Sequence, residues 1–315
     1  MDLYLSIIIP VFNEEENIVP LISEIESALS NQTWDYEIIA VDDGSHDRSF
    51  EVLKTLAHDN RRLRVLRFWK NSGQSAAFDA GFRKVRGLNV ITMDSDRQNN
   101  PNDIPKLLTK LEEGYDFVTG WRKDRKDDFF FRTLPSRIAN KLIRKVTDTH
   151  FQDLGCSLKA YRRAITDRLF LYGEMHRFIS VSVEMLGARV AEVEVDHRPR
   201  VAGVSKYNLT RTVKVLFDLM TVWFFQRFHT KPIYIFGSVS AVLTVGSVFL
   251  SALVLWQKYE EGVFVHRNPL FIISVFSFAI AVQFLFMGIV AEILIRTYFE
   301  SQGQRPYAIR ESIGG

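Results

Sequence analysis

The sequence predicts a doubly wound, mostly parallel α/β domain, followed by an interfacial amphipathic helix and two transmembrane helices. Strand-like and helix-like segments alternate over the first 120 residues, which is typical of a parallel sheet with helices on both faces. Polar motifs follow the predicted strands, at the edge where open α/β sheets bind ligands. Two apolar segments near the C-terminus are each long enough to cross a bilayer.

The first 120 residues contain five predicted strands and four predicted helices. Residues 3–11 are nearly all apolar, as expected of a strand buried on both faces. The segment after it carries apolar residues at helical spacing. The full set of predicted elements is strands at 3–11, 36–41, 63–68, 90–94 and 116–119, and helices at 17–30, 48–58, 72–85 and 103–113.

The next hundred residues are less regular. Residues 129–146 are predicted to form a basic helix, and an irregular stretch and further helices follow to about residue 187, before a strand at 191–197. Residues 207–228 have helical apolar spacing with charges on the other faces. Such a helix either lies in the membrane interface or packs on the soluble domain.

Two C-terminal segments are predicted to span the membrane. Residues 233–256 contain no charged residue, and residues 269–295 have only Gln283 and Glu292 as strongly polar interruptions. Basic residues flank the outer ends of the pair, which places both termini in the cytoplasm by the positive-inside tendency. Small residues in the first span leave homo-oligomerisation through the membrane helices open.

These elements predict four regions along the chain. They are a cytoplasmic catalytic domain (1–206), a juxtamembrane amphipathic region (207–231), two transmembrane helices (232–298) joined by a short loop (257–268), and a cytoplasmic tail (299–315). The chain opens directly on a strand, without a signal peptide. Cys156 is the single cysteine, so no intrachain disulfide forms, which fits a reducing compartment.

The distribution of charge indicates a phosphate or membrane partner. The net charge is +3, which is too small to indicate a nucleic-acid partner. Nine Lys or Arg residues against three acids lie between Gly120 and Thr147. A basic cluster of this kind attracts nucleic acid, phosphate groups or an anionic membrane surface, or it forms the solvated face of a helix.

The run from Val90 to Asp96 ends an apolar strand in two carboxylates one residue apart. Because a strand alternates its side chains, Asp94 and Asp96 are expected to project from one face, where they could share a divalent cation. Mg²⁺ takes oxygen ligands and often uses one or two carboxylates together with substrate phosphates. A bare Asp-x-Asp pair is common on surfaces, and the metal-site prediction depends on its place after a strand and on the neighbouring motifs.

Four motifs in order resemble the inverting family 2 glycosyltransferases. They are IPVFNEE at 9–15, VDDGS at 41–45, NSG at 71–73 and DSDRQ at 94–98. Over essentially the whole chain, the sequence is similar to the polyprenyl-phosphate glycosyltransferases, which include dolichyl-phosphate mannose synthases and bacterial polyisoprenyl-phosphate glucosyltransferases. The resemblance implies a GT-A type nucleotide-sugar fold. The family usually has an apolar residue at Arg97 and a proline at Asn100.

The resemblance also implies roles for individual residues. Asp94 and Asp96 match the acidic pair that binds Mg²⁺ or Mn²⁺ in the family, and Gln98 is the candidate third ligand. Asp42 accepts hydrogen bonds from a base edge or ribose. The residues matched to nucleotide-sugar binding are Pro10, Val11, Asn13, Glu14, Asp42, Asn71, Gly73, Asp94 and Ser95.

The acceptor phosphate is matched to a second set of residues, because arginine forks suit phosphate oxygens. That set is Arg122, Arg132, Ser136, Arg200 and Lys206. Asp153 is the candidate general base. A phosphate monoester has a second pKa of about 6 and is already anionic at neutral pH. Orienting a basic side chain or the sugar is therefore the favoured role for Asp153.

The predicted reaction transfers a sugar from a nucleotide-sugar to a polyprenyl phosphate in one inverting displacement. The resemblance favours UDP-glucose and undecaprenyl phosphate, with GDP-mannose or a UDP-linked amino sugar as the alternative. A processive polysaccharide synthase needs a Gln-x-x-Arg-Trp element, which Gln226-Arg227-Phe228 does not supply. A non-catalytic membrane scaffold is the remaining alternative.

Overall fold

A computed structural model describes residues 3–123, 151–171, 173–198 and 232–301. The chain divides into two compact units, Met1–Met220 and Thr221–Gly315. The predicted basic helix at 129–146 and the amphipathic helix at 207–228 lie outside the described residues, as do the domain boundaries at 206 and 231, and all of these stay predictions.

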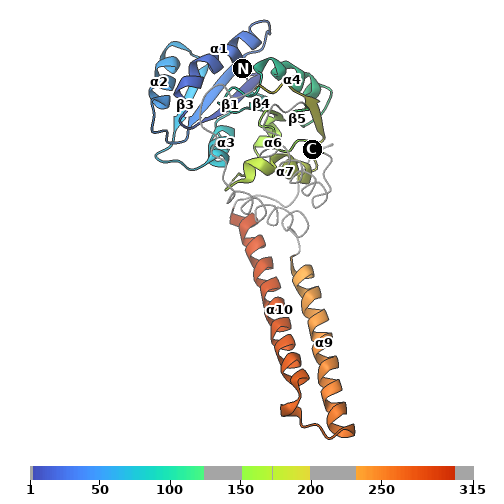
Figure 1. Cartoon of the computed structure of the whole chain (residues 1–315). Helices are drawn as coiled ribbons and strands as arrows, with labels where there is room; N and C mark the ends of the chain where they lie inside the picture. Colours follow the sequence, from blue (N-terminus) through green and yellow to red (C-terminus); the bar gives the residue numbers. More distant parts are fainter. Residues whose placement is uncertain (1–2, 124–150, 172, 199–231, 302–315) are drawn as a thin grey trace. The chain divides into compact units, whose positions relative to one another are not determined.

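The first unit is built on a seven-stranded sheet with the order β3-β2-β1-β4-β6-β5-β7 (Figure 1). All the strands run in one direction except β6, which is antiparallel to both of its neighbours. The predicted doubly wound, mostly parallel sheet is confirmed. The strands are β1 (Leu5–Val11), β2 (Tyr36–Asp42), β3 (Leu63–Arg67), β4 (Asn89–Thr92), β5 (Phe117–Trp121), β6 (Lys159–Arg162) and β7 (Val190–Glu194).

Helices cover both faces of this sheet because the central strands are apolar on both sides. Ile7 and Ile9 of β1 are buried in a core with apolar residues of α1 (Glu15–Leu29), α2 (Ser49–Asp59) and α4 (Ile104–Glu112). Ile8 faces the opposite way, toward α3 (Gln74–Phe82), where a Cβ on Gly81 would lie 2.5 Å from its Cγ2. Each fully buried isoleucine contributes about 1.5–3 kcal/mol.

The α3 face continues into an aromatic cluster. The ring centroids of Phe117 and Tyr161 are 5.1 Å apart, and those of Phe82 and Tyr161 are 5.4 Å apart. Tyr161 lies on β6, so this cluster holds the antiparallel strand to the parallel part of the sheet. The short elements of the unit are η1 (Pro101–Asp103), α6 (Arg163–Thr166), η3 (Met175–Phe178) and α7 (Ile179–Met185).

Two local predictions were wrong. Residues 159–162 were expected in an irregular and helical stretch, but they form β6, because pairing with β4 and β5 and the burial of Tyr161 favour an extended backbone. The strand leading to Asp94 ends at Thr92. Asp94 therefore lies just past the strand and Asp96 lies in a turn next to Arg97, which has a positive φ of 60°, so strand alternation does not place them.

The second unit contains two long helices, α9 (Ile233–Glu260) and α10 (Pro269–Ser301), which lie side by side (Figure 1). Both are long and apolar enough to cross a membrane, and few of their apolar residues are buried within the unit. The Ser247 hydroxyl donates a hydrogen bond to the Ser274 carbonyl (2.8 Å). A Cβ on Gly237 or Gly246 would meet no described heavy atom within 4 Å, so the oligomer prediction stays open.

Candidate functional site

The loops after β1 and β2 are joined by hydrogen bonds between their backbone and side chains. Asn13 has a positive φ of 56°, its N–H donates to Ser45 Oγ (3.0 Å), and its Oδ1 accepts from the His46 N–H (2.8 Å). The Glu14 N–H donates to Ser49 Oγ (2.8 Å). This left-handed turn reverses the chain directly after β1 and holds Asn13 and Glu14 at the carboxyl end of the sheet.

Asp43 ties a third loop to these two. Its carboxylate accepts hydrogen bonds from the backbone N–H groups of Ser72 (2.6 Å) and Gly73 (2.9 Å). Burial raises the pKa of the Asp43 carboxyl, although these two bonds lower it. Gly44 lies beneath the loop with φ +68°, where a Cβ would approach the Lys70 carbonyl carbon to 2.6 Å. Only glycine fits this crossing.

Asp42 ends β2 as a fully buried side chain beside Val11 of β1. Its Oδ1 accepts from the Ser45 N–H (3.2 Å), and Arg67 Nε lies 3.5 Å from its Oδ2 as an ion pair. Oδ2 accepts no hydrogen bond from any described residue. A buried carboxylate oxygen with an unfilled lone pair is costly without a donor, which fits the predicted role as an acceptor for a ligand.

Asp94, Ser95 and Asp96 follow β4 at the same edge. Gln74 Nε2 donates to Asp94 Oδ1 (2.7 Å), which joins the start of α3 to the loop after β4. The Gln98 N–H donates to Asp96 Oδ1 (3.2 Å). Burial, and then the charge of Asp96, raise the pKa of Asp94 to about 6. The negative charge of Asp96 thus disfavours ionisation of Asp94.

A divalent cation fits this pair because it would relieve both the burial penalty and the repulsion. Within the described ranges, no three His, Cys, Asp or Glu side chains are grouped as metal ligands. The donor set is therefore Asp94 and Asp96, with substrate phosphates available to supply further oxygens. Gln98, the third predicted ligand, directs its Nε2 to the Arg198 carbonyl (3.5 Å).

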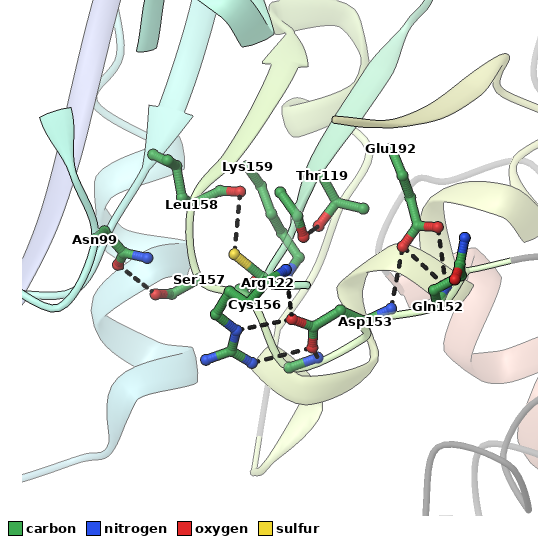
Figure 2. A network of polar contacts seen from close by, with 12 residues as sticks. Asn99, Thr119, Arg122, Gln152, Asp153, Cys156, Ser157, Leu158, Lys159 and Glu192 are labelled. Carbon is green, nitrogen blue, oxygen red and sulfur yellow. Dashed lines mark hydrogen bonds and ion pairs between the residues drawn. The ribbon is translucent and has the colours of Figure 1, made fainter. Parts of the chain in front are cut away.

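Arg122, which directly follows β5, forms a buried, bidentate ion pair with Asp153 (Figure 2). Arg122 Nε donates to Asp153 Oδ2 (2.7 Å) and Nη2 to Oδ1 (3.0 Å), with 12% and 4% of the two side chains exposed. Burial works to lower the pKa of Arg122, but the hydrogen bonds and charge of Asp153, together with the charge of Asp94, raise it overall. Asp153 thus orients the guanidinium.

Lys159 on β6 is a second cation of this cluster, and it was not among the site residues predicted from the sequence (Figure 2). Its side chain is buried, and its ammonium donates to the Cys156 carbonyl. Burial and the positive charge of Arg122 lower the pKa of Lys159, against the attraction of Asp153 and Asp94. A lysine is rarely buried without partners, but its sequence signal depended on recognising β6 as a strand.

The structure brings most of the predicted site residues to one edge of the sheet. Pro10 and Val11 end β1, and the loops after β1 to β4 carry Asn13, Glu14, Asn71, Gly73 and Ser95 together with the acids. Their roles stay predictions. Four predicted acceptor-phosphate residues lie outside the described residues: Arg132, Ser136, Arg200 and Lys206.

Comparisons with known proteins identify the family of the chain. A model of the family described as "Glycosyl transferase family 2" matches residues 6–170. The chain is similar to dodecaprenyl-phosphate galacturonate synthase of Rhizobium johnstonii, with 37% identity over 98% of this chain and 93% of that protein. It is also similar to undecaprenyl-phosphate 4-deoxy-4-formamido-L-arabinose transferase of Aeromonas hydrophila, with 35% identity over 98% and 93%.

The fold is shared with solved glycosyltransferase structures. Glucosyl-3-phosphoglycerate synthase of Mycobacterium tuberculosis, in complex with Mn²⁺, UDP and phosphoglyceric acid, matches with a TM-score of 0.55 and 20% identity, covering 70% of this chain and 78% of that one. Mannosyl-3-phosphoglycerate synthase of Rubrobacter xylanophilus matches with a TM-score of 0.54 and 18% identity, covering 70% and 73%. The chain therefore belongs to glycosyl transferase family 2, as a polyprenyl-phosphate glycosyltransferase with a GT-A-like fold.

Proposed function

We propose that this enzyme transfers a sugar from a nucleotide-sugar to the phosphate of a membrane polyprenol, with inversion at the anomeric carbon. The observation that carries the proposal is the position of Asp94 and Asp96 after β4 and of the buried Arg122–Asp153 pair after β5, both at the carboxyl edge of the sheet. The acids suit the donor diphosphate and its cation, and the arginine suits the acceptor phosphate. The curated relatives are named for the same class of acceptor.

In this mechanism an oxygen of the lipid phosphate forms a bond to the anomeric carbon, and the bond from that carbon to the nucleoside diphosphate breaks. Mg²⁺ or Mn²⁺ held by Asp94 and Asp96 would neutralise charge on the departing diphosphate. The acceptor phosphate, with a second pKa of about 6, is ionised at neutral pH and needs no base. Asp153 instead fixes the direction of the Arg122 guanidinium.

The nucleotide half of the donor is assigned to the loops after β1, β2 and β3. Asp42 Oδ2 is buried and receives no hydrogen bond from the described residues, so a ribose hydroxyl or base N–H would complete it. The backbone N–H groups of Asn13, Glu14 and Gly73 donate hydrogen bonds to side chains of the loop after β2 and the start of α2, which holds these residues at the same edge. Both termini are assigned to the cytoplasm, where the nucleotide-sugar is made available.

The donor sugar is tested by a panel. The purified chain is incubated with undecaprenyl phosphate, Mg²⁺ and nucleotide-activated glucose, mannose, galacturonate or 4-deoxy-4-formamido-L-arabinose. The lipid product is then identified from its mass by mass spectrometry. UDP-glucose was predicted from the sequence, and the relatives are named for the last two sugars. We expect one sugar–phosphate lipid, lost in the Asp94→Ala/Asp96→Ala variant. A folded chain that labels no lipid with any donor is a scaffold instead.

A further inference from the structure

The loop that carries the acidic pair is tied to the segment leaving β7. The Arg198 N–H donates to the Gln98 carbonyl (2.9 Å), and Asn99 and His197 form an antiparallel bridge. The Asp196 N–H donates to Asp103 Oδ2 (2.8 Å). Two stretches almost one hundred residues apart in the sequence are thus connected by a β-bridge with a backbone hydrogen bond and by a bond from a backbone N–H to a carboxylate.

The carboxylate of Glu24 on α1 forms an ion pair with one arginine from each of these two stretches. Arg97 Nε donates to Glu24 Oε1 (3.1 Å), and Arg198 Nη1 donates to Glu24 Oε2 (3.0 Å). The Glu24 side chain is 25% exposed, and those of Arg97 and Arg198 are 23% and 35% exposed. The guanidinium of Arg198 also reaches Asn100 Oδ1 through Nη2 (2.8 Å). One carboxylate oxygen of Glu24 therefore bonds to the loop after β4 and the other bonds to the segment after β7. We call this contact the junction.

We propose that Glu24 is a positioning residue that couples the Asp94–Gln98 loop, on the donor side, to the Arg198 segment that leads into Arg200 and Lys206, on the acceptor side. Arg97 and Asn100, the two positions at which the chain departs from the family pattern, both take part in this junction. The assignment of the sides rests on the proposed function. The coupling itself rests only on the contacts of Glu24.

The test compares Glu24→Gln with Glu26→Gln, which removes the same charge from the same helix at a carboxylate bonded to Asn60 (2.7 Å). Hydrogen–deuterium exchange of the full chain in detergent reports the Asp196 and Arg198 amides directly. We expect Glu24→Gln to raise deuterium uptake at least threefold both in peptides containing Gln98 and in peptides containing Arg198. The Glu26→Gln control leaves both unchanged.

Kinetics give a second readout, since small displacements of reacting groups cost up to about 100-fold in rate. We expect Glu24→Gln to lower kcat about tenfold with the donor KM within twofold, and Glu24→Asp to recover part of the loss. Should Glu24→Gln not accumulate, Arg97→Gln removes one side of the junction alone and is expected to raise uptake around Gln98.

Uptake that rises on one side only in Glu24→Gln, on neither side, or throughout the unit overturns the coupling. An equal loss of kcat in Glu26→Gln overturns it as well. A wild-type chain without transferase activity would contradict the proposed function. The hydrogen–deuterium exchange experiment would still test whether Glu24 couples the two segments.

Discussion

Replacing Asp153 by alanine removes the partner of a guanidinium that is only 12% exposed. Three donors of Arg122 lose their acceptor, namely Nε (2.7 Å), Nη2 (3.0 Å) and the backbone N–H (3.3 Å), and the Gly155 N–H (3.1 Å) loses it as well. Breaking a buried pair in this way costs about 3–5 kcal/mol. One kcal/mol shifts the Tm of a domain of this size by about 2–4 °C, so we expect a fall of roughly 6–20 °C.

Lys123, the residue after Arg122, supplies a control because it forms an exposed ion pair. Lys123 pairs with Glu194 at 3.6 Å, but the two side chains are 57% and 58% exposed, and solvent screens the pair. Glu194→Gln should therefore cost under about 1 kcal/mol. Tm is measured for both variants on the purified chain by intrinsic fluorescence. An Asp153→Ala protein that melts within about 2 °C of the Glu194→Gln control would falsify the stabilising role of the buried pair.

The same position separates orientation from proton removal. Asp153→Asn keeps one oxygen for Arg122 but turns an N–H₂ group toward the guanidinium, so an orienting role predicts a turnover loss of about 10–100-fold at every pH. Turnover is followed across a pH series with saturating donor. Activity that is lost at low pH and restored at alkaline pH would instead assign Asp153 as the base.

Three further outcomes are expected. Asp43→Asn leaves one of the Ser72 and Gly73 N–H donors without an acceptor, and the donor KM should rise about tenfold; an unchanged donor KM contradicts the loop assignment. Gly44→Ala places a Cβ 2.6 Å from the Lys70 carbonyl carbon at positive φ, and should lower Tm, while a Tm equal to wild type shows that the loops can separate freely. Cys156 is buried and its thiol pKa is raised, so the thiolate is scarce below that pKa; intact mass should show alkylation by iodoacetamide only after denaturation, and rapid labelling of the native chain contradicts this burial.

The regular elements of the first 120 residues were predictable because their signals are local. The apolar run of β1 and the helical spacing of α1 indicate elements whose observed bounds, Leu5–Val11 and Glu15–Leu29, lie within two residues of those predicted. The polar motifs at the strand ends predicted the site edge for the same reason. In a parallel sheet, knowing where each strand ends also places the loops that follow it.

Long-range pairing was not predictable in the same way. The strand β6 is four residues long and has no strong alternation, and it exists because β4 and β5 bond to it on both sides. The burial of Lys159 follows from that pairing. Likewise, a local backbone reversal at Arg97, and not the strand period, sets where Asp94 and Asp96 lie.

The sequence by itself determined the order of the elements, the two apolar helices and the chemical type of each site residue, because hydropathy period and motif identity are properties of neighbouring residues. Only the tertiary structure decided which charges meet. Asp153 pairs with Arg122 across 31 positions, and Glu24 joins Arg97 to Arg198 across 174 positions on the longer side. Such pairs form because folding removes these side chains from water together, and a buried charge is stable only beside the partner that the fold supplies.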